Sequence, residues 1–242
     1  MRMTTHGDYL VQLTRFPGFF PVNCYFVRED DGLTLVDTGM FGSATAILAA
    51  TQQLAQPIRR IVLTHAHGDH VGSLDALHKQ LPEADVLISA RDARFLTGDM
   101  RLDPNEPQAK LRGSYQKVTT RPDRLLHDGD QVGSLRVISA PGHTPGHLAL
   151  FDTRDGSLIA GDALQTQGGV AVAGSVRWRF PFPAIATWYP PVALASVRRL
   201  RTLAPTRLAV GHGDLLEQPL AAMDRAITAA VRTFGEVVYH DA

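Results

Sequence analysis

The chain has 242 residues, of which 44% are hydrophobic, so it is long enough to bury a sizeable core in one large domain or two small ones. Its 24 Lys and Arg residues balance its 24 Asp and Glu residues, so no net charge attracts nucleic acid or anionic lipid. Because the first residues show no apolar signal region, no stretch is long enough to span a membrane and Cys24 is the only cysteine, we expect a cytoplasmic protein that binds neither nucleic acid nor membranes.

Short apolar runs bounded by turn residues predict two series of strands. The first series is expected at residues 9–16, 24–29, 33–38, 59–65 and 84–89, and the second at 135–140, 148–153 and 157–162. Helices are expected at residues 44–55 with Ser43 as the cap, 71–81 opened by Asp69 or His70, 190–205 and 217–234. Strands interleaved with helices in this way predict an α/β sandwich with its helices outside.

Two segments, residues 98–123 and 165–191, fit neither pattern. The first is rich in proline and charged residues, and the second is rich in glycine, proline and aromatic residues. Long irregular segments in a compact domain are often functional loops or lids, so we expect such a role for both.

The most informative stretch is THAHGDHVG at residues 64–72, directly after the apolar run IVL. Four ionisable side chains lie within it: His65, His67, Asp69 and His70. Gly68 and the preceding β-branched run favour a strand that ends in a loop. Three imidazoles and a carboxylate that converge there would repel one another if charged, and would lack partners if buried, unless a cation shares their lone pairs. The stretch therefore predicts a divalent metal, for which imidazole and carboxylate ligands favour zinc and also suit iron, manganese or cobalt.

Further candidate ligands follow other predicted strands, each after an apolar run and near a glycine. They are His143 in SAPGHTPGH, Asp162 in SLIAGDAL and His212 in RLAVGHGD. Several strands can deliver the residues at their ends to one edge of a sheet, so we expect these side chains to meet those of residues 64–72. The sequence thus predicts one composite metal site.

The chain resembles the metallo-β-lactamase-fold superfamily from about Val22 to His212. The resemblance rests on the motif His-X-His-X-Asp-His at residues 65–70, on the ordered series His143, Asp162 and His212, and on LTLVDTG at residues 33–39. It implies a single domain over residues 1–242 with a four-layer αββα sandwich, and two metal ions at one edge of the sheets.

The resemblance also implies a role for each ligand. The first metal would be bound by His65, His67 and His143, and the second by Asp69, His70 and His212. Asp162 would bridge the two ions, and Asp37 would be a buried acceptor that orients a ligand. His147, the second histidine of PGHTPGH, is expected to be a packed structural residue, because the family places its ligand at the first.

A site of this kind implies hydrolysis. Two divalent ions about 3.5 to 4 Å apart lower the pKa of a bridging water from about 15.7 toward 7, and the hydroxide attacks a carbonyl that one metal polarises. We therefore expect a small ester, lactone or thioester as the substrate and two divalent ions, zinc first, as the cofactors. Asp69 and Asp162 are the expected catalytic residues, Asp69 also as an acid or base.

Differences between this chain and known subfamilies of the fold narrow the range of expected reactions. β-Lactamases of this fold commonly carry Cys or Ser in place of Asp162 and are exported, so antibiotic hydrolysis is not the expected role. N-acyl homoserine lactonases are similar in size and ligands, but many carry a tyrosine where this chain has Gln165. A persulfide dioxygenase of the same fold, with one iron held by His65, His143 and Asp162, stays open as an alternative, as does a non-catalytic metal-binding protein.

Aromatic side chains are expected near the substrate. Five of them follow the predicted bridging aspartate and form either a substrate groove or part of the core: Trp178, Phe180, Phe182, Trp188 and Tyr189. The stretch FPGFFPVN, with Phe16, Phe19 and Phe20, supplies either the opposite wall or a contact in a homodimer.

Overall fold

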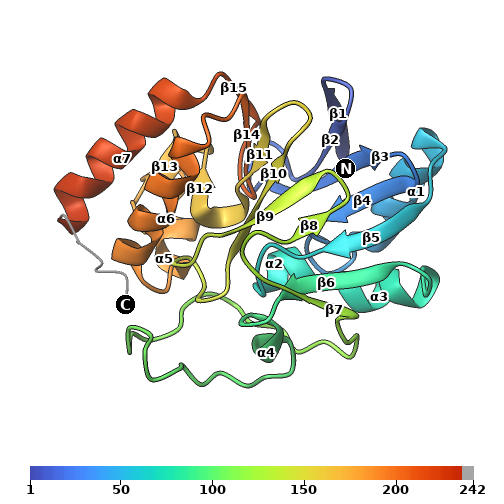
Figure 1. Cartoon of the computed structure of the whole chain (residues 1–242), viewed down its shortest axis with the longest axis horizontal. Coiled ribbons are helices and arrows are strands. Elements are labelled where there is room, and N and C mark those ends of the chain that lie inside the picture. Colours follow the sequence, from blue (N-terminus) through green and yellow to red (C-terminus); the bar gives the residue numbers. More distant parts are fainter. Residues whose placement is uncertain (236–242) are drawn as a thin grey trace.

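Two β-sheets packed face to face form the centre of the computed structural model, which describes residues 1–235 (Figure 1). The first sheet contains, in this order, β1 (Arg2–His6), β2 (Leu10–Arg15), β3 (Val22–Glu29), β4 (Gly32–Val36), β5 (Ile58–Val62), β6 (Asp85–Ser89) and β7 (Arg124–Leu126). The second contains β15 (Leu216–Glu217), β14 (Arg207–Ala209), β11 (Ser157–Ile159), β10 (Leu148–Asp152), β9 (Leu135–Ser139) and β8 (Gln131–Val132). A separate hairpin pairs β12 (Leu164–Gln165) with β13 (Ala171–Val172).

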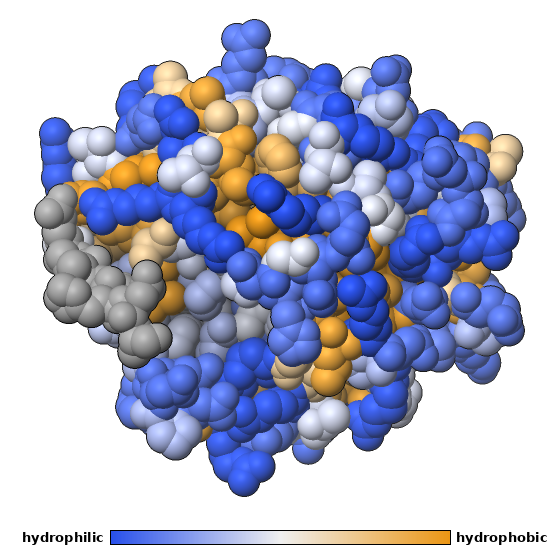
Figure 2. All heavy atoms as spheres, in the orientation of Figure 1, coloured by the Kyte–Doolittle hydropathy of each residue, from blue (hydrophilic) through white to orange (hydrophobic). Residues whose placement is uncertain are grey.

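Helices cover the outer faces of both sheets (Figure 1). α1 (Ala44–Leu54) and α3 (Leu74–Gln80) pack on the first sheet, and α6 (Pro190–Thr202) and α7 (Leu220–Phe234) pack on the second. The shorter helices are α2 (Gly68–Val71), α4 (Ala93–Leu96), the 3-10 helix η1 (Gly161–Ala163) and α5 (Phe182–Ala186). The order helix, sheet, sheet, helix confirms the predicted αββα sandwich. Hydrophilic residues cover most of the face shown in Figure 2, because the helices turn their apolar sides inward.

Side-chain alternation along the strands produces these layers, because successive side chains point to opposite faces of a sheet. In β4, Leu35 belongs to the cluster beneath α1 and α3, whereas the next residue, Val36, packs between the two sheets. In β10, Ala149 packs beneath α6 and α7, whereas Leu150 packs between the sheets. Both faces of these two strands are therefore buried, and such strands appear in the sequence as nearly continuous apolar runs.

All eight predicted strands and all four predicted helices are present, but three of these predictions were wrong in detail where the site begins. The strand expected at 59–65 stops at Val62, so His65 lies in the loop that follows it. The strand expected at 157–162 stops at Ile159, because the chain tightens into η1. The helix expected at 71–81 is divided into α2 and α3. Ser73 interrupts it, since its hydroxyl donates to the carbonyl of Met40 (2.7 Å) and accepts from the amide of Ser43 (2.8 Å). The predicted capping role of Ser43 was also wrong: it precedes α1, but its side chain makes no capping hydrogen bond.

Charged side chains fix the first irregular segment against the body of the protein. Arg91 pairs with Glu106 (2.6 Å) and Arg94 with Asp103 (2.6 Å). At the other end of the segment, Asp75 accepts hydrogen bonds from the backbone amides of Thr119 and Thr120. The segment therefore has a defined path although it contains almost no regular structure.

None of the helices within residues 1–235 has the length and apolar composition that a membrane crossing needs. The single domain predicted over residues 1–242 extends beyond this range, and positions 236–242 lie outside the described residues. The cytoplasmic location and the homodimer stay predictions.

Candidate metal centre

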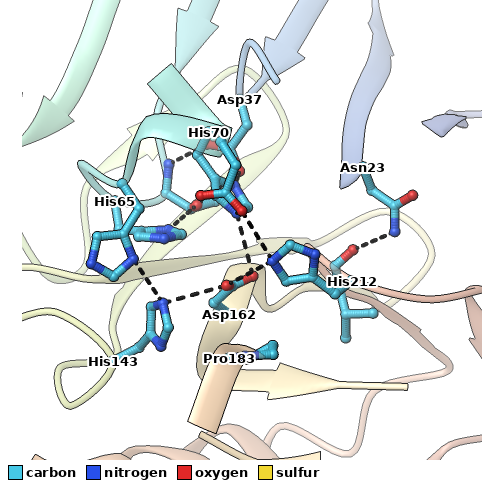
Figure 3. A network of polar contacts seen from close by, with 12 residues as sticks. Asn23, Asp37, His65, His70, His143, Asp162, Pro183 and His212 are labelled. Atoms are coloured by element: carbon cyan, nitrogen blue, oxygen red, sulfur yellow. Dashed lines mark hydrogen bonds and ion pairs between the residues drawn. The ribbon is translucent and has the colours of Figure 1, made fainter. Parts of the chain in front are cut away.

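The seven predicted ligands lie together at one edge of the two sheets. The loop after β5 carries His65 and His67, α2 carries Asp69 and His70, the loop after β9 carries His143, η1 carries Asp162, and the loop after β14 carries His212. Figure 3 shows His65, His70, His143 and His212 gathered around Asp162. All seven side chains are buried except that of Asp69, which is about one-quarter exposed at 26%.

The donor atoms form three overlapping sets, each within 4.8 Å. They are His65, His67 and His143; His65, His70 and Asp162; and Asp69, His70 and His212. The first and third sets are the predicted sites of the two metals. Asp162 lies between them, because its Oδ2 is 3.3 Å from Nε2 of His143 and its Oδ1 is 3.5 Å from Nε2 of His70. This position suits a bridging carboxylate.

Every candidate imidazole uses one ring nitrogen to donate to an acceptor outside the centre. The pairs are His65 Nδ1 with Thr64 Oγ1 (3.0 Å), His67 Nε2 with the Arg112 carbonyl (3.0 Å), His70 Nδ1 with Asp37 Oδ2 (2.8 Å), His143 Nδ1 with Thr187 Oγ1 (3.1 Å), and His212 Nδ1 with the Pro21 carbonyl (2.7 Å). Carbonyls and carboxylates only accept, and both threonine hydroxyls are already donors elsewhere. The other ring nitrogen of each neutral imidazole therefore carries a lone pair toward the centre.

The free donor atoms fit divalent cations. Three of them, His65 Nε2, His70 Nε2 and Asp162 Oδ1, are buried without any hydrogen-bond partner. In addition, Nδ1 of His67 faces Nε2 of His143 at 3.0 Å, although the protons of both rings are used on the opposite side. Unpaired buried polar atoms are costly, and facing lone pairs repel, so a shared cation satisfies the whole set.

Burial and the nearby carboxylates shift the pKa values of the histidines in opposite directions. Burial lowers the pKa of His67 to about 4 and the pKa values of His65 and His143 well below the usual range, so these imidazoles are neutral at pH 7, which is the form that binds a metal ion. Burial also disfavours a charge on His70, but the carboxylates of Asp162, Asp37 and Asp69 raise its pKa to about 9. Metal binding on that side therefore displaces a proton.

Asp37 has the orienting role that the sequence predicted. Its Oδ2 accepts from His70 Nδ1, and its Oδ1 and Oδ2 accept from the backbone amide and the hydroxyl of Thr64, each at 2.8 Å. Because Thr64 in turn accepts from His65, one carboxylate controls the ring orientation of two candidate ligands.

His147 belongs to none of the three ligand sets among residues 1–235. Its buried Nε2 accepts from the backbone amide of Asp162 at 3.0 Å, which fixes the backbone of that carboxylate. This contact agrees with the structural role expected of His147, while the choice of His143 as a ligand stays a prediction.

The two irregular segments supply contacts that the sequence did not reveal. Segment 98–123 provides the Arg112 carbonyl beneath His67 and the ring of Tyr115, whose centroid is 4.7 Å from that of His67. Segment 165–191 provides Thr187 beneath His143. Both segments therefore contact candidate ligands, and no pattern in the sequence points to these particular residues.

Asp92 is a further buried carboxylate that the sequence analysis missed. Its Oδ2 accepts from the Ala66 amide (3.1 Å) and the Thr144 hydroxyl (2.7 Å), and its Oδ1 accepts from the Gly146 amide (2.7 Å). Burial raises its pKa to about 6, against the opposing effect of these hydrogen bonds. Asp92 thus joins the two loops that carry His65, His67 and His143. Its position after β6 resembles that of the ligands after other strands, but an aspartate before a helix also fits an N-cap.

Asp92→Asn is expected to weaken the binding of one metal about 10- to 100-fold, because the amide presents N–H to groups that are themselves donors. Metal per chain, measured by elemental analysis after dialysis, tests this. Asp152→Asn is the matched control, since Asp152 is also buried but accepts from Arg154 and Ser134, away from the ligand loops. Equal metal loss in both variants would contradict the prediction.

A cavity of about 240 Å³ opens over the centre. Its lining residues are Phe20, His67, Asp69, Gly113, Ser114, His143, Asp162, Phe182, Pro183, Ile185, Ala186 and His212. The groove interpretation of the aromatic stretch therefore holds only for Phe182, because Phe180 and Trp188 are buried in the core. Phe20 supplies the opposite wall. Gln165 does not line the cavity, and its amide donates to the carbonyls of Gln167 (2.8 Å) and Phe180 (3.1 Å).

Comparison with known proteins identifies relatives over nearly the whole chain. The sequence model described as Metallo-beta-lactamase superfamily matches residues 17–212. The Bacillus subtilis protein YobT is 49% identical over 231 residues, which cover 95% of this chain and 99% of YobT. The probable metallo-hydrolase YflN of the same organism is 29% identical over 214 residues, which cover 79% of this chain and 80% of YflN.

Two further comparisons concern activity and metal. A hydroxyacylglutathione hydrolase of Aeromonas salmonicida is 32% identical over 156 residues, but the match covers only 63% of this chain and 50% of that enzyme. The crystal structure of TTHA1623 in a di-iron-bound form is 27% identical and superimposes with a TM-score of 0.66, over 87% of this chain and 96% of the other.

Proposed function

The chain belongs to the metallo-β-lactamase superfamily as a metallo-hydrolase, and we propose that it hydrolyses a small ester, lactone or thioester with two divalent ions held by the cluster. The observation that carries this proposal is the convergence of five imidazoles and two carboxylates, three of whose buried donor atoms have no hydrogen-bond partner among residues 1–235. Zinc is the first choice of metal, and the di-iron-bound neighbour keeps iron, with manganese and cobalt, among the alternatives.

We assign the first ion to His65, His67 and His143 and the second to Asp69, His70 and His212, with Asp162 between them. When bound there, the two ions would supply an activated water and polarise the carbonyl oxygen of the substrate. The chain contributes the remaining functions. Asp69 faces the cavity with a partly exposed carboxylate, which can accept a proton from a water and return it to the leaving group.

The apolar wall around the centre supports a substrate with a carbonyl and an apolar substituent. Phe182 and Ile185 of α5 line one side of the cavity, and Phe20 lines the other. These side chains bind apolar groups and limit the access of bulk water, which strengthens the electrostatic interactions at the carbonyl.

The specific reactions considered for this fold are supported to different degrees. The match to a hydroxyacylglutathione hydrolase favours thioesters, although it spans half of that enzyme. For an N-acyl homoserine lactone, Gln165 offers no side chain to the carbonyl, because its amide is buried against backbone carbonyls. In the mononuclear persulfide dioxygenase, one iron would be held by His65, His143 and Asp162. The set of Asp69, His70 and His212 would then hold no metal.

The proposal predicts that hydrolysis depends on metal. Protein stripped with a chelator and reloaded separately with zinc, manganese, cobalt or iron is mixed with lactones, aryl esters and neutral thioesters, and proton release is followed with a pH indicator. We expect two metals per chain and turnover of at least one substrate class by the loaded protein, with none by the stripped control. Two bound metals with no turnover across the panel would contradict the reaction class, and one iron per chain with oxygen uptake on persulfides would identify the dioxygenase.

A further inference from the structure

A second cavity, of about 370 Å³, shares part of its lining with the first. Phe20, Asp69 and Ser114 line both cavities, while Met40, Phe41 and Gln116 line only the second. Because Asp69 belongs to the metal centre and borders both, a ligand over the centre can extend into either cavity.

Phe20 belongs to the walls of both spaces. Its ring is 5.5 Å from that of His212 and 5.0 Å from that of Phe182, measured between centroids. These contacts place it directly against one candidate ligand and against the wall formed by α5. A substrate that reaches both cavities would therefore pass Phe20, with its reacting carbonyl at the metal centre.

Both cavities present apolar side chains that the protein leaves exposed. Ile185 is 59% exposed at the first, and Phe41 is 81% exposed at the second. The Phe41 loop is nevertheless anchored, because Nη1 of Arg15 donates to the Phe41 carbonyl at 2.8 Å. Exposed apolar side chains on either side of a reactive centre are the expected partners of apolar groups in a substrate.

The lining also sets the charge of the substrate. Among the described residues that line the two cavities, none is Lys or Arg, and the ionisable ones are all assigned metal ligands. A carboxylate placed in either cavity away from the metal ions would lose water without gaining a counterion from the protein, which is unfavourable. Leaving groups whose charges extend beyond the metal centre, such as glutathione, are therefore disfavoured in both positions.

We propose that the substrate is an open-chain ester or thioester with neutral, apolar groups on both sides of its carbonyl, one in each cavity. This inference rests on the proposed hydrolase function and adds the substrate class. Ile185 and Phe41 are the residues that set specificity, each for a different side of the scissile bond.

Two substrate series test the proposal on the metal-loaded protein. In one, the acyl chain lengthens from acetyl to octanoyl with a fixed alcohol or thiol, and in the other the leaving group lengthens with a fixed acyl group. We expect kcat/KM to rise about two- to fourfold per methylene in both series until each cavity is filled. We expect S-lactoylglutathione to react at least about tenfold more slowly than a neutral thioester of similar size.

Substitutions at one residue of each cavity separate the contributions of the two cavities. Ile185→Ala should flatten the dependence on chain length in one series, and Phe41→Ala should flatten it in the other. Val176→Ala is the control, because Val176 is also exposed, at 67%, but lines neither cavity, and it should leave both series unchanged.

The possible outcomes distinguish the two proposals. If the loaded wild-type protein hydrolyses no ester, lactone or thioester, the proposed function itself fails. If it hydrolyses only lactones, the function stands and the open-chain substrate is wrong. If it hydrolyses esters or thioesters but shows no chain-length dependence, prefers the charged thioester, or responds to both variants in the same series, the function stands and the two-cavity substrate is wrong.

Discussion

Asp162→Ala is expected to release at least one metal ion and to lower kcat/KM by on the order of 10³-fold or more. Asp162 is the only side chain whose carboxylate approaches members of both metal sets among residues 1–235, at 3.3 Å from His143 Nε2, 3.2 Å from His212 Nε2 and 3.5 Å from His70 Nε2. Without it, Asp69 is the only carboxylate left among the assigned ligands to offset the charge of two divalent ions. Elemental analysis gives the metal content, and kinetics on the best substrate of the panel give the loss of activity.

Asp152→Ala is the matched control for this prediction. Asp152 and Asp162 are both 3% exposed, but Asp152 pairs with Arg154 at 2.7 Å and has no contact with a candidate ligand. The control should lose stability, seen as a lower Tm, and keep both metals. Full metal occupancy in the Asp162→Ala protein would remove Asp162 from its bridging position.

The positions of the candidate ligands could be predicted because they follow a rule of sheet geometry. Each of the strands β5, β9, β11 and β14 is an apolar run that ends just before one or more of these residues, and such strands deliver their ends to one edge. The spacing within residues 65–70 then required a cation on chemical grounds alone. Asp37 also follows a strand, β4, but its role was expected only from the family resemblance.

By contrast, most of the groups that orient the candidate ligands could not be predicted from the sequence. His67 and His212 donate to backbone carbonyls, of Arg112 and Pro21, and every residue in the sequence offers such a carbonyl. Thr187 lies in an irregular segment whose path depends on tertiary contacts instead of on periodicity. The division between α2 and α3 depends on Ser73, whose bonding partners are distant in sequence. Local patterns therefore located the donors, whereas the surrounding shell required the folded chain.

Gly113→Ala is expected to disturb the centre from within the irregular segment. Gly113 has φ of 88°, and a Cβ added there would overlap Nε2 and Cε1 of the His67 imidazole. The ring would have to move and give up its hydrogen bond to the Arg112 carbonyl, which sets its tautomer. We expect metal affinity to fall about 10- to 100-fold and kcat/KM to fall about 100-fold, because small displacements of a ligand are costly.

Gly129→Ala is the control that separates the effect of the contact with His67 from the effect of backbone strain. Gly129 has almost the same φ, 85°, but an added Cβ would meet nothing within 4 Å. Both substitutions therefore place alanine in a left-handed conformation that costs about 1 to 2 kcal/mol, so both should lower Tm, and Gly113→Ala should lower it further because the His67 ring must also move. Only Gly113→Ala should lose metal, as measured by titrating the stripped protein with zinc. Equal zinc affinity in the two variants would mean that the irregular segment does not hold His67 in place, and that the order of the centre comes from the strand ends alone.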